Sequence, residues 1–203
     1  MKRWFSILTL SFGLTIAAAA AQADHPIDQV KYTAEKILAV LNDSNLKGED
    51  RKAERNRLIR QELDQRFDWQ AICRGCLGHH WTKLSADQRK EFMDLFERFL
   101  ERTYLDRIEP YYNDLEKIEY QGEKIIDTYA SVKSLITTKQ KVEHPVEYRL
   151  ERSGSNGWRV YDIVIEGVSL VSNYRTQFND IILKSSYQAL LNDLRAKVEA
   201  KKG

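Results

Sequence analysis

The spacing of apolar residues divides the chain into two parts, and the first part has the period of an α-helix. From residue 26 to about residue 107, apolar side chains recur every three or four positions, as they do along the buried face of a helix. This spacing predicts four helices, over about 26–41, 50–66, 69–80 and 86–107. The fourth helix has the most apolar stripe, which comprises Phe92, Leu95, Phe96, Phe99, Leu100 and Tyr104.

Polar residues mark the expected ends of these helices. Asp68 stands where an N-cap is expected for the third helix. Ser85 and Gln88 have the spacing of a capping box, in which each side chain accepts a hydrogen bond from the other residue's backbone N–H. We expect Pro110 to end the helical part, because proline cannot donate the helical hydrogen bond and clashes with the preceding turn.

After Pro110 the apolar residues alternate with polar ones, which is typical of β-strands. The alternation predicts four strands, over 115–120, 129–138, 142–152 and 158–165. Along the third, Val146, Tyr148 and Leu150 alternate with Glu147, Arg149 and Glu151. The turn 153–157 ends in Asn-Gly, so the third and fourth strands are expected to form an antiparallel hairpin.

After Gly167 the helical period returns and predicts one long helix to about residue 200. The order of elements therefore predicts an α+β fold. In it, a helical N-terminal half and a C-terminal helix pack on a curved, four-stranded antiparallel sheet.

The first 23 residues have the pattern of a secretory signal peptide. Lys2 and Arg3 precede an apolar run that closes on Ala21-Gln22-Ala23, and a small-x-small exit of this kind favours cleavage before Asp24. The remaining residues, 24–203, are expected to form a single domain, because no Ser-, Gly- or Pro-rich linker divides them. The protein is therefore expected to be exported.

Charge excludes one class of function. The chain has 32 Lys and Arg against 30 Asp and Glu, and the two extra basic residues belong to the leader, so residues 24–203 carry no net charge. A general nucleic-acid binder needs a basic surplus, which is absent here. No apolar run after residue 23 approaches the length that spans a bilayer.

Cys73 and Cys76 form a Cys-x-x-Cys pattern that permits several interpretations. Leu77 stands where a c-type haem site would need histidine, so haem is excluded. Zinc binding with His79 and His80 and a redox role both remain open. We favour core packing, with or without an i,i+3 disulfide, because the two thiols continue an apolar helical stripe and no strand precedes them.

The sequence offers no signature of an enzyme. It contains no Gly-x-Ser-x-Gly, no His-Glu-x-x-His and no glycine-rich phosphate loop. The aromatic stripe of the fourth helix has two interpretations, an ordinary filled core or the wall of an apolar cavity that suits acyl chains. Periodicity alone does not distinguish them.

The C-terminal hairpin and the helix after it resemble the MlaC family, the periplasmic phospholipid carriers also called toluene-tolerance proteins. The resemblance rests on Tyr148-Arg149-Leu150 and on the run from Trp158 to Phe178, with Phe67-Asp68, Leu77-Gly78-His79-His80-Trp81 and Ser85-x-x-Gln88-Arg89-x-x-Phe92 upstream. It covers nearly all of residues 26–195. The Cys-x-x-Cys departs from the family pattern.

The resemblance implies a monomeric, non-enzymatic periplasmic shuttle without metal or cofactor, which carries one phospholipid as cargo with its tails in an apolar cavity. Its implied partners are an outer-membrane lipoprotein complex and the substrate-binding subunit of an inner-membrane ABC transporter, which together maintain outer-membrane lipid asymmetry. Two alternatives are a carrier of hopanoids or other lipids with the same fold and a periplasmic thiol-disulfide protein that uses Cys73 and Cys76.

We expect the acyl chains to contact inward-facing apolar side chains of the fourth helix, the last two strands and the start of the final helix. This set comprises Phe92, Phe96, Phe99, Val146, Tyr148, Leu150, Val160, Val164, Val168, Leu170 and Val171. Arg149 and Arg175 are candidates for the head-group phosphate, because a guanidinium forks onto phosphate oxygens. Pairing with surface acids is the alternative role for each.

Overall fold

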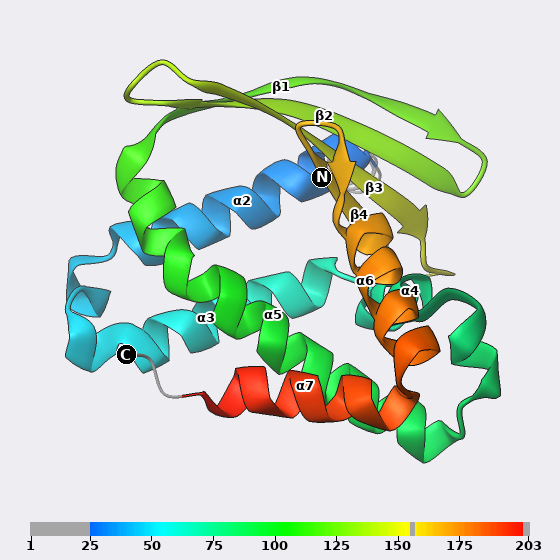
Figure 1. Ribbon diagram of the computed structural model, residues 1–203. Coiled ribbons are helices and arrows are strands. Elements are labelled where there is room, and N and C mark those ends of the chain that lie inside the picture. The colour runs from blue at the N-terminus through cyan, green and yellow to red at the C-terminus, as the bar shows by residue number, and fades with distance from the viewer. Residues whose placement is uncertain (1–24, 155–156, 201–203) are drawn as a thin grey trace, which may run out of the picture.

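The chain folds into helices that lie beneath one face of an antiparallel sheet, as a computed structural model shows for residues 25–154 and 157–200 (Figure 1). The mixed helix-and-sheet class expected from the sequence is confirmed. The expected leader over residues 1–23, its cleavage site before Asp24 and the turn residues 155 and 156 lie outside the described residues.

The helical part contains α2 (Pro26–Asn42), α3 (Lys52–Arg66), α4 (Trp69–Leu77) and α5 (Ala86–Asp114), joined by short 3-10 turns at Ser44–Leu46, Glu49–Arg51 and Gly78–Lys83. Asp68 caps α4, because its carboxylate accepts a hydrogen bond from the backbone nitrogen of Ala71 at 2.8 Å. The capping box at the start of α5 is also confirmed. Gln88 N donates to Ser85 Oγ at 3.2 Å, and Ser85 N donates to Gln88 Oε1 at 2.9 Å.

Helix α5 continues through Pro110 to Asp114, so the expected end at the proline is wrong. The turns around the proline pack on α2 and α3 through an apolar cluster of Leu41, Ile59 and Leu105, with Ile108 and Tyr112 against it. This packing offsets the roughly 3 kcal/mol that a proline inside a helix costs. Helix α5 therefore extends the apolar wall that it presents to the sheet.

The sheet is a meander of β1 (Leu115–Ile126), β2 (Tyr129–Thr138), β3 (Glu143–Arg152), β4 (Trp158–Ile165) and the short β5 (Val168–Ser169), each antiparallel to the next. The predicted hairpin of β3 and β4 is confirmed. The short β5 makes this a sheet of five strands where four were expected, and β1 is longer than predicted. Its register shifts between Tyr120 and Gly122, and this irregularity interrupts the alternation that marks a strand in the sequence.

Two helices, α6 (Leu170–Lys184) and α7 (Tyr187–Glu199), take the place of the single long helix that periodicity predicts. The chain leaves helical geometry at Ser185, and Ser186 begins a new helix by accepting a hydrogen bond from Ala189 N at 3.1 Å. The break turns α7 back along α5, against which it packs (Figure 1).

Besides the cluster around Leu105, two larger apolar cores hold the described layers together. The helical core joins α4, α5, α6 and α7 and centres on Phe92, Phe96 and Phe178, whose rings stack or meet edge to face. The second core lies between α2 and the sheet and contains Leu150 and Trp158, both fully buried. Between these two cores the helices and the sheet do not fill the interior.

Candidate functional site

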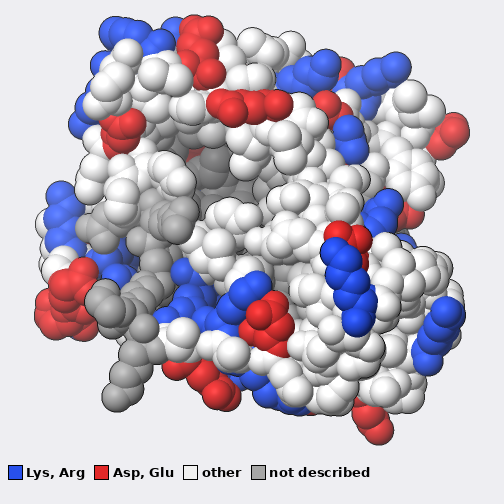
Figure 2. Space-filling model, in the orientation of Figure 1, with Lys and Arg blue, Asp and Glu red and all other residues white. Residues whose placement is uncertain are grey.

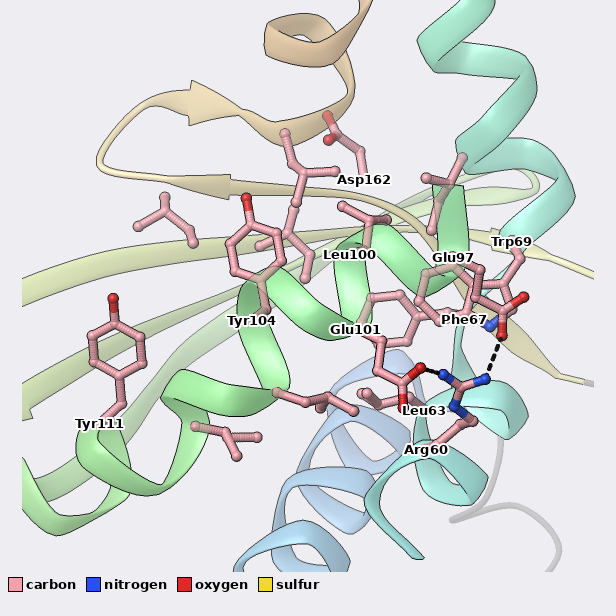
Figure 3. Close-up of a pocket in the computed structure, with 16 residues that line it drawn as sticks. Arg60, Leu63, Phe67, Trp69, Glu97, Leu100, Glu101, Tyr104, Tyr111 and Asp162 are labelled. Carbon is pink, nitrogen blue, oxygen red and sulfur yellow. Dashed lines mark ion pairs between the residues drawn. The ribbon is translucent and has the colours of Figure 1, made fainter. Parts of the chain in front are cut away.

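An apolar cavity of about 340 Å³ lies between α5, the α3–α4 segment and strand β4 (Figure 3). Its volume falls within the range of about 300–1,000 Å³ that is usual for ligand pockets. The uncharged lining residues are Leu63, Phe67, Trp69, Ile72, Leu100, Tyr104, Leu105, Ile108, Tyr111, Ile163, Ile165 and Leu170. Four charged residues complete the lining, Arg60, Glu97, Glu101 and Asp162.

Helix α5 supplies the longest wall of the cavity. Its lining residues recur every three or four positions from Glu97 to Tyr111, so they form one stripe along the helix. Tyr111 belongs to this stripe only because the helix passes through Pro110. The part of α5 that continues beyond Pro110 therefore lengthens the cavity.

A bulge in β4 decides which of its side chains face the cavity. Leu150 pairs with Val160, but its neighbour Arg149 pairs with Asp162, so Tyr161 is an extra residue without a partner of its own. An extra residue of this kind shifts the alternation of a strand by one position.

Beyond the bulge, Ile163 and Ile165 lie on the face of the sheet that carries Val160, and both line the cavity. Val164 pairs with Glu147 and lies on the other face. Val160 and Val164 are both buried, as expected of inward-facing residues, but the bulge places them on opposite faces and neither lines the cavity.

One end of the cavity is open to solvent. Tyr104, Tyr111 and Ile165 line it and yet remain 44%, 64% and 47% exposed. Val168, which begins β5 and pairs with Ile165, is 60% exposed. Figure 2 shows a hollow on this face of the molecule, between the sheet and α5. An apolar molecule has a route into the interior here.

Asp162 has a structural role at the edge of the cavity. It is buried, and its carboxylate accepts hydrogen bonds from Ser169 Oγ at 2.7 Å and from Val171 N at 3.0 Å. It also forms an ion pair with Arg149 at 3.3 Å. These bonds fix the first turn of α6 against β4.

The other three charged residues form one group on the wall between α3 and α5. Arg60 on α3 forms ion pairs with Glu97, at 3.7 Å, and with Glu101, both on α5 (Figure 3). Burial raises the pKa of Glu97, Asp64 raises it further, and Arg60 opposes both effects.

The aromatic residues expected to contact acyl chains lie in the helical core. Phe92 and Phe96 are fully buried there, and Phe99 packs against Tyr174 of α6 with ring centroids 5.9 Å apart. The cavity is lined by the neighbouring face of α5, which includes Leu100 and Tyr104.

Of the other residues expected at the site, only Leu170 is a lining residue of the cavity. Leu150 and Val160 are buried in the core beneath the sheet, and Val171 is buried in the helical core. The remaining residues of this set are Val146 and Tyr148, which share the face of Leu150, and the exposed Val168.

The two candidate head-group arginines have protein partners. Arg149 pairs with Asp162 and with Glu147, the latter at 3.3 Å. Arg175 donates from Nε to the carbonyl oxygen of Gly75 at 2.7 Å, which joins α6 to α4. Neither arginine lines the cavity.

Cys73 and Cys76 are buried free thiols in the helical core. Burial raises the pKa of both, that of Cys76 to about 12, whereas a redox cysteine needs a lowered pKa. Gly75 between them lies against Val171 of α6, where a Cβ would come within 2.7 Å of the valine Cγ1. The motif therefore serves the close contact of α4 with α6.

The cavity has lining residues that the sequence analysis does not single out. They include Leu63 on α3, Tyr111 beyond the expected end of the fourth helix, and Ile163 next to the expected Val164. For Tyr111 a signal was present in the sequence, because residues of the α5 stripe recur every three or four positions along the helix past Pro110.

Residues 25–154 and 157–200 contain no cluster of three or more His, Cys, Asp or Glu side chains that could hold a metal ion. Over the same ranges, no helix is both long and apolar enough to cross a membrane.

The fold and the site thus define an α+β domain with an apolar cavity that opens to solvent. The model of the family described as MlaC protein matches residues 31–196, and the chain belongs to this family.

One relative is the intermembrane phospholipid transport system binding protein MlaC of Haemophilus influenzae, 23% identical over 198 residues, which cover 96% of this chain and 92% of the relative. A solved structure of similar fold is a phospholipid-binding protein from Ralstonia solanacearum in complex with a phospholipid. It has a TM-score of 0.73 and 26% identity, with 85% of this chain and 96% of that chain covered.

Proposed function

We propose that this protein is a periplasmic carrier that binds a phospholipid and moves it between the outer and the inner membrane. The observation that carries the proposal is the apolar, solvent-open cavity in a chain of the MlaC family. The phospholipid bound to the Ralstonia solanacearum protein and the transport system named for the Haemophilus influenzae relative support the choice of ligand and process.

In this proposal the acyl chains lie along α5, between this helix and the sheet, in the cavity whose exposed end is lined by Tyr104, Tyr111 and Ile165. Each methylene group that leaves water contributes about 0.8 kcal/mol. The buried apolar residues named above, among them Phe96, Leu150 and Val160, support the walls and come into contact with a tail if the helices separate from the sheet. The head group stays near the surface.

The cellular setting is part of the proposal. Residues 1–23 direct export and are removed, and residues 24–203 act as one monomeric domain. The carrier exchanges lipid with an outer-membrane lipoprotein complex and with the substrate-binding subunit of an inner-membrane ABC transporter. It has no energy source of its own, so the direction of transfer follows from its relative affinity for lipid at the two ends. It performs no covalent chemistry and needs no cofactor.

The proposal is tested by what the purified protein carries. Residues 24–203 are prepared from the periplasm without detergent, and bound lipid is extracted and identified by mass spectrometry. A phospholipid in amounts near one per chain supports the proposal. A folded protein that carries no lipid and takes none up from phospholipid vesicles contradicts it, and a hopanoid as the sole cargo replaces the phospholipid with another lipid.

A further inference from the structure

The apolar cavity has one charged corner whose groups face the interior. Arg60 on α3 meets the carboxylates of Glu97 and Glu101 on α5, and Figure 3 shows the three side chains joined at the cavity wall. Their side chains are 27–32% exposed. Asp162, the remaining charged lining residue, is already bonded to the start of α6.

The charge of this corner is unbalanced. Among the described lining residues Arg60 is the only basic one, and it faces two carboxylates. Asp64, one turn along α3, adds a further negative charge that acts on Glu97. Arg159, which donates to the carbonyl oxygens of Asp64 and Phe67, adds a positive one, so the carboxylates remain in excess by one. The carboxylates of this corner can therefore pair with one more positive charge. Their ion pairs also hold the guanidinium of Arg60 in place, and a guanidinium can form two hydrogen bonds to anionic oxygens.

Two aromatic rings lie beside the same corner. Phe67 and Trp69 line the cavity and stack on each other with centroids 5.3 Å apart, and Figure 3 places both next to Glu97. Trp69 Nε1 donates to Asp64 Oδ1 at 2.8 Å, which fixes the indole. Aromatic faces beside carboxylates attract organic ammonium groups.

We propose that this corner recognises a zwitterionic phospholipid head group that carries an ammonium, such as phosphoethanolamine or phosphocholine. This inference rests on the proposed function and names the cargo that the cavity selects. Arg60 binds the phosphate, and Glu97 and Glu101 face the ammonium beside Phe67 and Trp69. A head group that has a phosphate but no ammonium places a negative charge beside Glu97 and Glu101. It supplies no positive charge to compensate theirs.

The experiment offers the protein equal amounts of three lipids. Lipid-free protein is incubated with vesicles made of equal parts of phosphatidylethanolamine, phosphatidylcholine and phosphatidylglycerol, and the loaded lipid is quantified by mass spectrometry. Ion pairs between partly exposed groups contribute about 0.5–1 kcal/mol, the upper part of the range for surface pairs. We therefore expect roughly two- to five-fold enrichment of each zwitterionic lipid over phosphatidylglycerol.

Variants separate recognition from a structural ion pair between α3 and α5. The double variant Glu97→Gln/Glu101→Gln is expected to lose the enrichment. Glu54→Gln is the matched control, because it removes an exposed pair with Arg57 on α3 outside the cavity. It is expected to keep the enrichment.

The possible outcomes test the recognition site and the carrier function separately. Equal loading of all three lipids by the wild type, or a preference that the double variant retains, overturns the recognition site and leaves the carrier function standing. Failure of the wild type to load any of the three lipids contradicts the proposed function itself.

Discussion

A side chain that fills the cavity should weaken lipid binding without unfolding the protein. Ile163 is suited to this test, because it lies on β4 beyond the bulge, lines the cavity and is only partly buried. The variant Ile163→Trp places an indole in space that we assign to an acyl chain. The rest of the wall remains as in the wild type.

The expected loss follows from the methylene groups that the indole displaces. If about three of them return to water at about 0.8 kcal/mol each, binding weakens by about 2.4 kcal/mol. At about 1.4 kcal/mol for each factor of ten, this corresponds to a roughly 50-fold increase in Kd. The Kd is measured by titrating lipid-free protein with a phospholipid that carries a fluorescent acyl chain.

The matched control makes the same kind of enlargement elsewhere. Leu183 on α6 is 70% exposed and does not line the cavity, so Leu183→Trp should bind with the affinity of the wild type. Circular dichroism and the melting temperature verify that both variants are folded. An Ile163→Trp variant that is folded and binds as tightly as the control refutes the assignment of the cavity to the acyl chain.

Four further predictions concern the framework around the cavity. Asp162→Ala should lower the free energy of unfolding by about 2–3 kcal/mol in urea titrations, because it strands the donors at the start of α6; a loss below about 0.5 kcal/mol contradicts this role. Gly75→Ala should also destabilise, by about 1–3 kcal/mol from overpacking against α6, and an unchanged midpoint would show that the helices separate freely. The thiols of Cys73 and Cys76 should resist a thiol reagent at pH 8 until the protein is unfolded, because burial raises the pKa of both; rapid labelling of folded protein argues for a redox role. The pKa of Glu97 in the folded state lies above its ordinary value of 4.5, so the folded protein loses stability as pH rises from this value through the folded-state pKa. Glu97→Gln removes the ionisable group, and its effect on the melting temperature should therefore be more stabilising at pH 7 than at pH 4. An equal effect at the two pH values contradicts the shift.

Local signals in the sequence determine many of the element boundaries. The caps at Asp68 and Ser85 involve residues three positions apart, so their geometry depends on little beyond the chain segment itself. The bounds of β2 and β4 also match the alternation of side chains. Such features can be predicted from the sequence because the contacts that determine them join residues close together in the chain.

The features that shape the cavity depend on contacts between distant segments. Helix α5 passes Pro110 because its last turns pack on α2 and α3, and the bulge at Tyr161 is visible only in the register of β4 against β3. The break at Ser185 and Ser186 likewise lies within a continuous helical period. Periodicity indicates which side chains are apolar, but whether the elements enclose a filled core or a cavity depends on how closely they pack.

The mass of the intact, native protein tests the central claim most directly. Residues 24–203, purified from the periplasm without detergent, are measured by native mass spectrometry before and after extraction with organic solvent. The account predicts a complex heavier than the polypeptide by one phospholipid, and the extracted lipid accounts for the difference. A folded monomer at the mass of the bare polypeptide, which stays at that mass after incubation with phospholipid vesicles, contradicts it.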